Sequence, residues 1–361
     1  MLFPSTLATL AIFASATSAL VAPRITPRSP TGECECETKL QRKAWHTLSA
    51  TEKKAYIDAE LCLMKLPAKL GLTGAKNRFE ELQSAHQVQA GITHGVGAFL
   101  PFHRLHMYAH EQLLRNECGY KGAQPYWDET RDAGKFNTSD VFDPVTGFGG
   151  NGVGANGCIV DGPFADFKNN LGPGYRIGDS LNCINRFVDD TISVMAGQEY
   201  LDFCLKKTTY VDFWLCAENA PHRSGHGGVG GKMTDPIASP GDPIFYLHHT
   251  WLDRLFWQWQ SLDLANRLTE MGGGNVQTGF GFGPPPTAGG ESGPPVVAPQ
   301  GWFPPFDSMR PPAGAAPQVP AGDPGNTTTL SHILNMFGVI PNATIAEVMD
   351  IGGPLLCFEY V

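Results

Sequence analysis

The histidines that most constrain this chain lie in two groups, far apart in the sequence. The groups are His86, His94 and His103, and then His222, His226 and the adjacent pair His248 and His249. Both fall in segments of helical character, so each can direct three imidazoles at one metal ion. Imidazole suits copper, zinc, iron and nickel, and copper(II) binds it most tightly among the common divalent ions. The fold must therefore unite two sets of neutral nitrogen donors, which indicates a two-metal centre.

Length and charge narrow the possible functions. The chain has 361 residues, enough to bury a sizeable core in one large domain or two smaller ones. Its formal net charge of −9 argues against nucleic-acid binding, because neutralising phosphates requires basic patches. Its 42 glycines and 29 prolines predict much irregular backbone. No linker separates a second domain, and we expect small molecules as partners.

The N-terminus has the pattern of a secretory signal. A short apolar run over residues 7–14 precedes the small residues Thr17, Ser18 and Ala19, which are typical of a cleavage site. We expect a signal peptide over residues 1–19, a short pro-segment to about residue 28, and one domain over residues 29–361. No stretch is long enough to span a bilayer, so we expect no membrane anchor.

Cysteines and sequons agree with an exported protein. An oxidising compartment would pair eight of the nine cysteines and leave one over, and their order does not give the connectivity. A metal-binding knuckle at residues 34–36 is disfavoured, because no second cysteine pair completes it. Sequons for N-glycosylation begin at Asn137, Asn326 and Asn342. The sequence therefore predicts a secreted, disulfide-bonded glycoprotein of unknown oligomeric state.

Hydrophobic periodicity predicts a series of helices with long irregular connections. The predicted helices cover residues 37–65, 77–89, about 101–116, 208–226 and 243–268. The stretch 140–173 is rich in glycine, and the stretch 271–325 is so rich in glycine and proline that we expect no regular elements there. A short helix near residues 329–336 and a closing strand within residues 355–360 are expected at the end.

The first histidine group would converge from three directions. Pro101 suits a first helical turn, which places His103 early in a helix, His94 in the preceding loop and His86 at the end of the helix before. His106 and His110 follow His103 at i+3 and i+7, so spacing alone would let them form a ladder on one face. We place these two outside the centre, as partners of Glu111 or facing solvent, although periodicity does not settle the choice.

The second group begins with His222 and His226, which at i and i+4 lie on one side of a helical turn and can clamp an ion. Zinc peptidases with this spacing carry a glutamate after the first histidine, and Arg223 stands there instead. Adjacent helical positions point about 100° apart, so only one of His248 and His249 can face the centre.

Asp253 lies four residues beyond His249. At that distance its carboxylate could take part in the hydrogen bonding that orients metal-binding imidazoles.

Two segments carry a family resemblance. The segment His94-x4-Phe99-Leu-Pro-Phe102-His103-Arg104-x2-Met107-x3-Glu111 resembles the first copper signature of the tyrosinase and catechol oxidase family. The segment Asp242-Pro243-x-Phe245-Tyr-x2-His249-x3-Asp253 resembles the second. Residues 125–128 and 358–360 also look like family landmarks. The resemblance spans residue 34 to the C-terminus and is greatest for the short secreted fungal forms.

The resemblance implies a mainly α fold, with a central four-helix bundle holding a dicopper centre, long Gly/Pro-rich loops and few short strands. It implies two copper ions as cofactors, one held by His86, His94 and His103. The other would be held by His222, His226 and His249. The chain ends just after Tyr360, so no C-terminal shielding domain is expected, and the stretch 271–325 is a candidate for controlling access.

The activity implied is oxidation of o-diphenols to o-quinones with O₂. Glu218 resembles the family's water-holding glutamate and is the candidate base, with a helix-surface carboxylate as the alternative. Arg223 stands where relatives that hydroxylate monophenols often have asparagine. A guanidinium cannot accept a hydrogen bond, so weak monophenol hydroxylation is expected, whereas its charge would attract acidic phenols. Gly227 is the third candidate active-site residue, with Glu218 and Arg223. Ile92 stands where many fungal relatives have a cysteine that forms a thioether with a histidine of the first copper.

Three alternatives stay open. Hemocyanin units resemble the same signatures and carry O₂ reversibly. A specialised oxidase acting on one phenolic metabolite or a peptide tyrosine would share the copper chemistry and differ in its pocket. A dizinc hydrolase is disfavoured by the lack of bridging carboxylates within the two groups.

Overall fold

The computed structural model describes residue 36 and residues 38–277, 293–295 and 322–361. The predicted signal peptide and pro-segment, Cys34 and most of the stretch 271–325 lie outside these residues. By contacts the chain divides into Met1–Glu35 and Cys36–Val361, and the second unit is described below.

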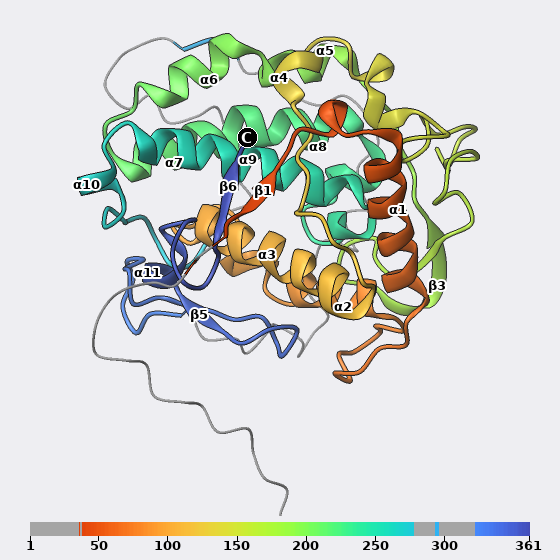
Figure 1. Cartoon of the computed structure of the whole chain (residues 1–361), viewed down its shortest axis with the longest axis horizontal. Coiled ribbons are helices and arrows are strands. Elements are labelled where there is room, and N and C mark those ends of the chain that lie inside the picture. Colours follow the sequence, from red (N-terminus) through yellow and green to blue (C-terminus); the bar gives the residue numbers. More distant parts are fainter. Residues whose placement is uncertain (1–35, 37, 278–292, 296–321) are drawn as a thin grey trace, which may run out of the picture. The chain divides into compact units, whose positions relative to one another are not determined.

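Four helices at the centre of the unit carry the histidines (Figure 1). They are α2 (Arg78–Gln87), α3 (Phe99–Glu117), α8 (Arg223–Val229) and α9 (Ile244–Ser261). Helices α3 and α9 pack along each other, and α1 (Ala50–Lys65) covers α2 and α3 from outside. The expected mainly α fold with a central bundle is confirmed.

Local sequence explains where these helices begin. Ser49 accepts a hydrogen bond from the Glu52 amide while the Glu52 carboxylate accepts one from the Ser49 amide, which is a capping box before α1. Asn77 caps α2 in the usual way, accepting from the Glu80 amide at 2.8 Å. Pro101 lies in the first turn of α3, where its missing N–H costs no helical hydrogen bond.

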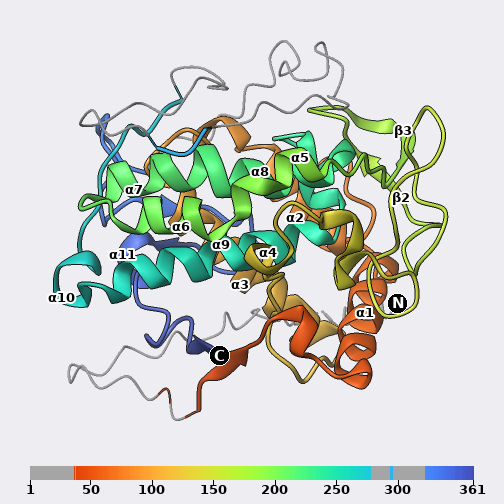
Figure 2. The ribbon, with the colours of Figure 1, turned by 90° about the horizontal axis from the view of Figure 1, so that it is seen from above.

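Shorter helices surround the bundle (Figure 2). They are α4 (Glu129–Asp132), α5 (Asp190–Ser193), α6 (Gln198–Leu205), α7 (Tyr210–Ala217), α10 (Leu264–Arg267) and α11 (Ile345–Val348). A π-helical turn over Glu218–His222 joins α7 to α8 and contains Pro221. Because proline lacks the N–H that an α-helix would use, the wider turn lets the chain continue in helical form.

The strands within the described residues form three small two-stranded sheets. β1 (Leu40–Arg42) pairs in parallel with β6 (Phe358–Tyr360), and Leu40 lies opposite Phe358. The antiparallel pairs are β2 (Lys168–Leu171) with β3 (Ile177–Cys183), and β4 (Ile333–Leu334) with β5 (Ala343–Thr344). The closing strand is therefore confirmed, and its partner lies near the other end of the unit.

One predicted helix begins too early in the prediction, and another is absent where it was predicted. The helix expected from residue 37 begins only at Ala50, because residues 40–42 pair with β6 and 45–47 form a 3₁₀ turn. The helix expected over residues 329–336 is replaced by β4, and the helical turn comes later, at α11. In both places strand pairing outweighed the local apolar spacing, with a distant partner for β1 and a nearby one for β4.

Eight cysteines form four disulfides. The pairs are Cys36–Cys357, Cys62–Cys118, Cys158–Cys183 and Cys204–Cys216. The expectation that eight cysteines pair is thus confirmed, and the ninth, Cys34, lies outside the described residues. The first bridge holds the strand pair β1–β6 together at its end. None of the described helices combines the length with the apolar character that crossing a bilayer requires.

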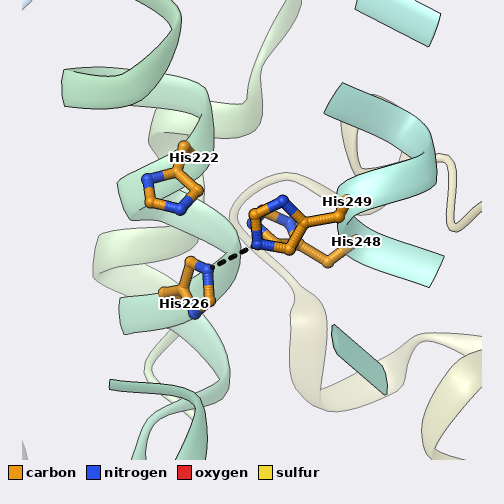
Figure 3. A group of neighbouring side chains, drawn as sticks. All are labelled: His222, His226, His248 and His249. Atoms are coloured by element: carbon orange, nitrogen blue, oxygen red, sulfur yellow. Dashed lines mark hydrogen bonds between the residues drawn. The ribbon is translucent and has the colours of Figure 1, made fainter. Parts of the chain in front are cut away.

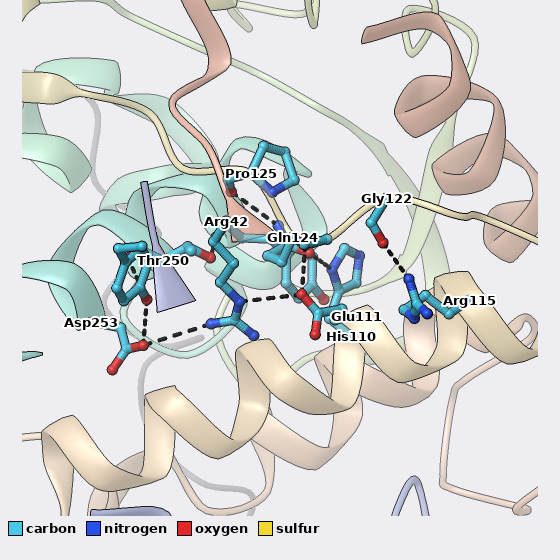
Figure 4. A network of polar contacts seen from close by, with 12 residues as sticks. Arg42, His110, Glu111, Arg115, Gly122, Gln124, Pro125, Thr250 and Asp253 are labelled. Carbon is cyan, nitrogen blue, oxygen red and sulfur yellow. Dashed lines mark hydrogen bonds and ion pairs between the residues drawn. The ribbon is translucent and has the colours of Figure 1, made fainter. Parts of the chain in front are cut away.

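A buried charge network ties the strand pair β1–β6 to the bundle (Figure 4). Arg42 of β1 donates from Nε to Glu111 of α3 at 3.2 Å, and its Nη1 lies 3.6 Å from Asp253 of α9. The same guanidinium lies over the ring of Phe358, 3.5 Å from its centroid. Because the side chains of Arg42 and Glu111 are fully buried, this pair fixes the strand pair β1–β6 against the helices that carry the histidines.

Candidate metal centre

The structure brings the first histidine group together as predicted. His86 lies near the end of α2, His94 in the loop before α3, and His103 in the second turn of α3. One nitrogen from each ring lies within 4.8 Å of the other two, and all three residues are buried.

The second group also converges (Figure 3). His222 and His226 project from the π-helical turn and α8 towards His248 and His249 of α9, and one nitrogen of each ring lies within 4.8 Å of the others. The Nε2 atoms of His226 and His249 are 3.1 Å apart. Two such nitrogens approach this closely only when a proton or a cation lies between their lone pairs.

The two groups face each other directly. The rings of His103 and His249 stack with their centroids 4.1 Å apart, and those of His94 and His222 lie 6.3 Å apart. Phe99 fills the space beside this contact, 4.8 Å by centroid from both His103 and His222. Ions held by the two groups would therefore lie near enough to share a small molecule.

Backbone carbonyls fix the tautomer of five rings. The carbonyls of Ile237, Ala90, Phe99, Glu218 and Met233 lie within hydrogen-bond distance of Nδ1 of His86, His94, His103, His222 and His226, in that order. A carbonyl can only accept, so each Nδ1 carries the proton and each Nε2 keeps a lone pair. Within the two groups, the buried Nε2 atoms without a hydrogen-bond partner among the described residues are those of His86, His103, His222 and His248. Such unpartnered nitrogens fit a metal ion.

Burial keeps these rings neutral. It lowers the pKa of His94 to about 4 and that of His226 to about 3, with the Ala90 and Met233 carbonyls opposing the shift. Burial also lowers the pKa of His86, His103 and His249 well below the ordinary value, and the neighbouring imidazoles add to the effect. Neutral imidazole is the form that binds a metal, so the site is ready to bind at neutral pH.

His106 and His110 are buried outside both groups. His106 bonds the Leu82 carbonyl through Nε2 at 3.1 Å. His110 bonds Gln124 at 2.8 Å and lies 3.0 Å from a Glu60 carboxylate oxygen. The prediction that both histidines lie outside the centre agrees with this geometry. However, neither ring bonds Glu111 and neither faces solvent. Those two interpretations are wrong, because both histidines project from α3 into the core.

Asp253 does not orient an imidazole. Its carboxylate instead bonds Arg104 and the Tyr360 hydroxyl and pairs with Arg42. The expected outer role is therefore wrong. Because Asp253 lies four residues after His249 on α9, its side chain points towards α3 and the C-terminal strand and away from the histidine groups.

The three further candidate residues lie along the segment that carries His222 and His226. Glu218 accepts hydrogen bonds from the Gly95 amide at 2.8 Å and from the Trp214 indole at 2.6 Å. Burial raises the pKa of the Glu218 carboxyl to about 7, with these two bonds opposing the shift. The hydrogen bond from Gly95, the residue after His94, disfavours the alternative that Glu218 is only a carboxylate on a helix surface. Arg223 is partly exposed at the start of α8, and Gly227 is buried within it.

Two residues of the site were missed by sequence reasoning. The carboxyl group of Glu129 in α4 forms a hydrogen bond with His248 Nδ1 at 2.6 Å. Both side chains are fully buried. Gly225 is the residue of α8 that faces this pair, and a Cβ there would stand 2.1 Å from His248 Nδ1. The position of Glu129, directly after the landmark at residues 125–128, was the one available signal. The role of Glu129 becomes apparent only from its tertiary contact with His248 of α9.

Comparisons with known proteins agree with this geometry. Residues 76–262 match the family profile of the common central domain of tyrosinase. Tyrosinase-like protein phomQ1 of Diaporthe leptostromiformis is 34% identical over 262 residues, covering 66% of each chain, so this chain spans about two thirds of that relative. Tyrosinase ustQ of Aspergillus flavus is 33% identical over 338 residues, covering 90% of this chain and 80% of the relative.

A solved structure extends the match to the whole fold. A polyphenol oxidase variant from Thermothelomyces thermophila superposes with a TM-score of 0.72 at 26% identity, covering 91% of this chain and 90% of that one. The profile covers more than half of the sequence, and the helices that it matches are those that carry both histidine groups. The chain belongs to the tyrosinase family.

Proposed function

We propose that this protein is a dicopper oxidase that converts o-diphenols to o-quinones with O₂ and hydroxylates monophenols only weakly. The observation that supports it most is the pair of facing histidine groups, in which the buried Nε2 atoms of His86, His103 and His222 have no hydrogen-bond partner among the described residues. Neither group contains a described carboxylate or thiolate. An all-imidazole donor set favours copper over the oxygen-seeking metals and offers no bridging carboxylate for a dizinc hydrolase.

Six histidines would hold the copper ions. His86, His94 and His103 would hold one, and the other would be held by His222, His226 and His249. We assign His249 rather than His248 because the ring of His249 stacks on that of His103 in the first group. The bound pair would supply the redox chemistry, in which two o-diphenols and one O₂ give two o-quinones and two water molecules.

Glu218 is our candidate for the base that takes the phenolic proton. It lies one helical turn before His222, and its hydrogen bond to Gly95 places it beside the loop that carries His94. The carboxylate therefore links the segment that carries His222 to the loop that carries His94. A carboxyl whose pKa is raised towards neutrality can accept a proton during turnover and release it again.

Arg223 directs the choice of substrate in this proposal. It follows His222 directly, and its charge interacts with that of Glu218. A guanidinium can donate but not accept, so it cannot help to deprotonate a monophenol, whereas it attracts phenols that carry an acidic group. We therefore expect carboxylated catechols to be preferred over neutral ones.

The test is a substrate panel on copper-loaded protein with metal quantification. We expect two copper ions per chain, rapid quinone formation from catechols, and slow turnover of phenol and tyrosol after a lag. Protein that binds two copper ions and reversibly binds O₂ but forms no quinone would show oxygen carriage instead. Turnover of a single phenolic metabolite or peptide tyrosine, with simple catechols inert, would identify a specialised tailoring oxidase.

We further infer that the protein is exported and glycosylated. The four disulfides fit an oxidising compartment, and the sequon residues Asn137, Asn326 and Asn342 are all exposed. Expression through a secretory host, followed by enzymatic removal of N-glycans, should lower the mass of the secreted product. An unchanged mass would contradict glycosylation.

A further inference from the structure

One loop supplies hydrogen-bond acceptors to a histidine of each group. The loop covers residues 231–241, between α8 and α9. Its Met233 carbonyl accepts from His226 Nδ1, and its Ile237 carbonyl lies 3.0 Å from His86 Nδ1. The two carbonyls thus orient rings that belong to different proposed copper sites.

The rings of His86 and His226 are oriented from this loop, unlike the rings of three other histidines of the two groups. His94, His103 and His222 each bond the carbonyl four residues before them, so their own helical or turn segment orients them. His86 and His226 lack such a local acceptor among the described residues and depend on the loop. The conformation of residues 231–241 therefore decides the orientation of these two rings together.

Asp235 lies midway between the two carbonyls and fixes the loop. Asp235 is buried, with 1% of its surface exposed. Oδ1 accepts from the amides of Ile237 and Ala238, both at 3.0 Å, and Oδ2 accepts from the Gly174 amide at 2.6 Å. The carboxylate thus holds the loop in a tight turn and anchors it to the hairpin β2–β3.

The same anchor reaches the helix that carries His86. Gln87 of α2 donates from Nε2 to the Gly174 carbonyl at 2.7 Å, and Gln83 of α2 donates to the Ala238 carbonyl at 3.2 Å. Helix α2, the hairpin and the loop are therefore joined by hydrogen bonds that meet around Asp235. Displacing the carboxylate would shift the Ile237 carbonyl relative to α2 and the Met233 carbonyl relative to α8.

We propose that Asp235 is a positioning residue that sets the metal affinity of both histidine groups at once, through the Met233 and Ile237 carbonyls. The proposal builds on the proposed copper sites. Residues that orient metal-binding imidazoles from outside typically change metal affinity by about 10- to 100-fold when they are replaced. Here one substitution is expected to weaken two sites in parallel, although Asp235 touches neither set of imidazoles.

The test uses Asp235→Asn and Asp235→Ala in the full chain. Asparagine keeps an oxygen for the Ile237 and Ala238 amides but turns an amide NH₂ towards the Gly174 amide, whereas alanine removes all three bonds. Metal-free protein is titrated with copper(I) against a chelating competitor, and with zinc as a probe without redox chemistry. We expect both dissociation constants to rise by about 10- to 100-fold, more for alanine than for asparagine.

A matched control separates positioning from general destabilisation. Asp143 also accepts three hydrogen bonds from its own loop, from the Val145 and Thr146 amides and the Thr146 hydroxyl. Asp143→Asn should lower the unfolding temperature of the metal-free protein without changing either metal affinity. If Asp235→Asn does not fold, Gln83→Met, which loosens the same loop from α2, should weaken both sites to a smaller extent.

Two results would overturn the proposal. One is unchanged metal affinity in folded Asp235 variants, and the other is weakening confined to one site. Binding by the wild-type protein is measured first and tests the proposed function separately. Wild-type protein that binds two metal ions but oxidises no phenol would contradict the oxidase function and leave the positioning test intact.

Discussion

At the scale of single residues, burial decides the charge of the ionisable side chains near the centre. His106 shows the effect apart from the two groups, since it bonds a backbone carbonyl and is fully buried. Burial lowers the pKa of its ring to about 3, against 6.5 for an ordinary histidine. Glu218 shows the opposite case, a carboxyl whose pKa burial raises.

Replacing His106 should change the acid stability of the metal-free protein. Between pH 6.5 and about 3, the unfolded chain binds a proton on this ring that the folded protein does not bind. The free energy of unfolding therefore falls as pH falls through this window, by up to about 1.4 kcal/mol per unit. His106→Gln should reduce the slope, measured by urea unfolding at several pH values. His46→Gln, at a partly exposed site, is the control, and equal slopes in His106→Gln and wild type would contradict the prediction.

Replacing Glu218 should separate the proposed base from metal binding. Glu218→Gln keeps the shape of the side chain but cannot take a proton, so kcat for a catechol should fall by about 10²- to 10⁴-fold with two copper ions still bound. Glu270→Gln is the control, because Glu270 likewise accepts a backbone amide, that of Tyr210, away from the centre. Steady-state kinetics with metal quantification checks both. A Glu218→Gln variant with wild-type kcat would remove the base from the mechanism.

At the scale of elements, close packing of α8 against α9 forms the second histidine group. Gly225 permits that approach, since a Cβ there would lie 2.1 Å from His248 Nδ1 and 2.8 Å from Glu129 Oε2. His222 and His226 flank this contact on the same segment. A shift of α8 would therefore displace both rings.

Gly225→Ala should impair the second group selectively. Overpacking of this kind costs about 1–3 kcal/mol, and the displaced α8 should release one copper ion of two. Metal content and thermal unfolding of the purified variant check this. Gly91→Ala is the control, because a Cβ there has no heavy atom within 4 Å although the site is close to His94. Retention of both ions by Gly225→Ala would show that α8 can move without affecting the site.

At the scale of the whole molecule, buried charges fasten the strand pair β1–β6 to the bundle, and a disulfide links the two segments that carry these strands. The pair of Arg42 and Glu111 is buried, whereas that of Lys54 and Asp58 on α1 is exposed at 2.6 Å. Removing one member of a buried pair leaves the other charge without compensation in a medium of low dielectric constant. An exposed pair is screened by water and contributes little.

Arg42→Ala should therefore destabilise the protein by about 3–5 kcal/mol. Lys54→Ala, which breaks a shorter but exposed pair, should change the free energy of unfolding by about 1 kcal/mol or less. Guanidinium unfolding of both variants at neutral pH gives the comparison. Equal destabilisation by the two substitutions would mean that the buried network does not anchor the strand pair β1–β6.

The sequence by itself determined the bundle helices and the identity of both histidine groups. Strong helical spacing, Pro101 at the start of α3 and the i, i+4 pair His222 and His226 are local features, so they can be read without knowing the fold. The resemblance to the tyrosinase family favours His249 over His248 as the third ligand of the second group, a choice that spacing could not make.

Only the tertiary structure decided what depends on contacts between distant segments. The strand pairing of β1 with β6, the burial of His106 and His110, the bonding of Asp253 to Arg104 and the role of Glu129 leave no periodic trace in the sequence. Each arises because packing removes water from polar groups, which must then bond whatever partner the fold brings near. The sequence therefore specifies which imidazoles are present, and the fold specifies which atoms orient them.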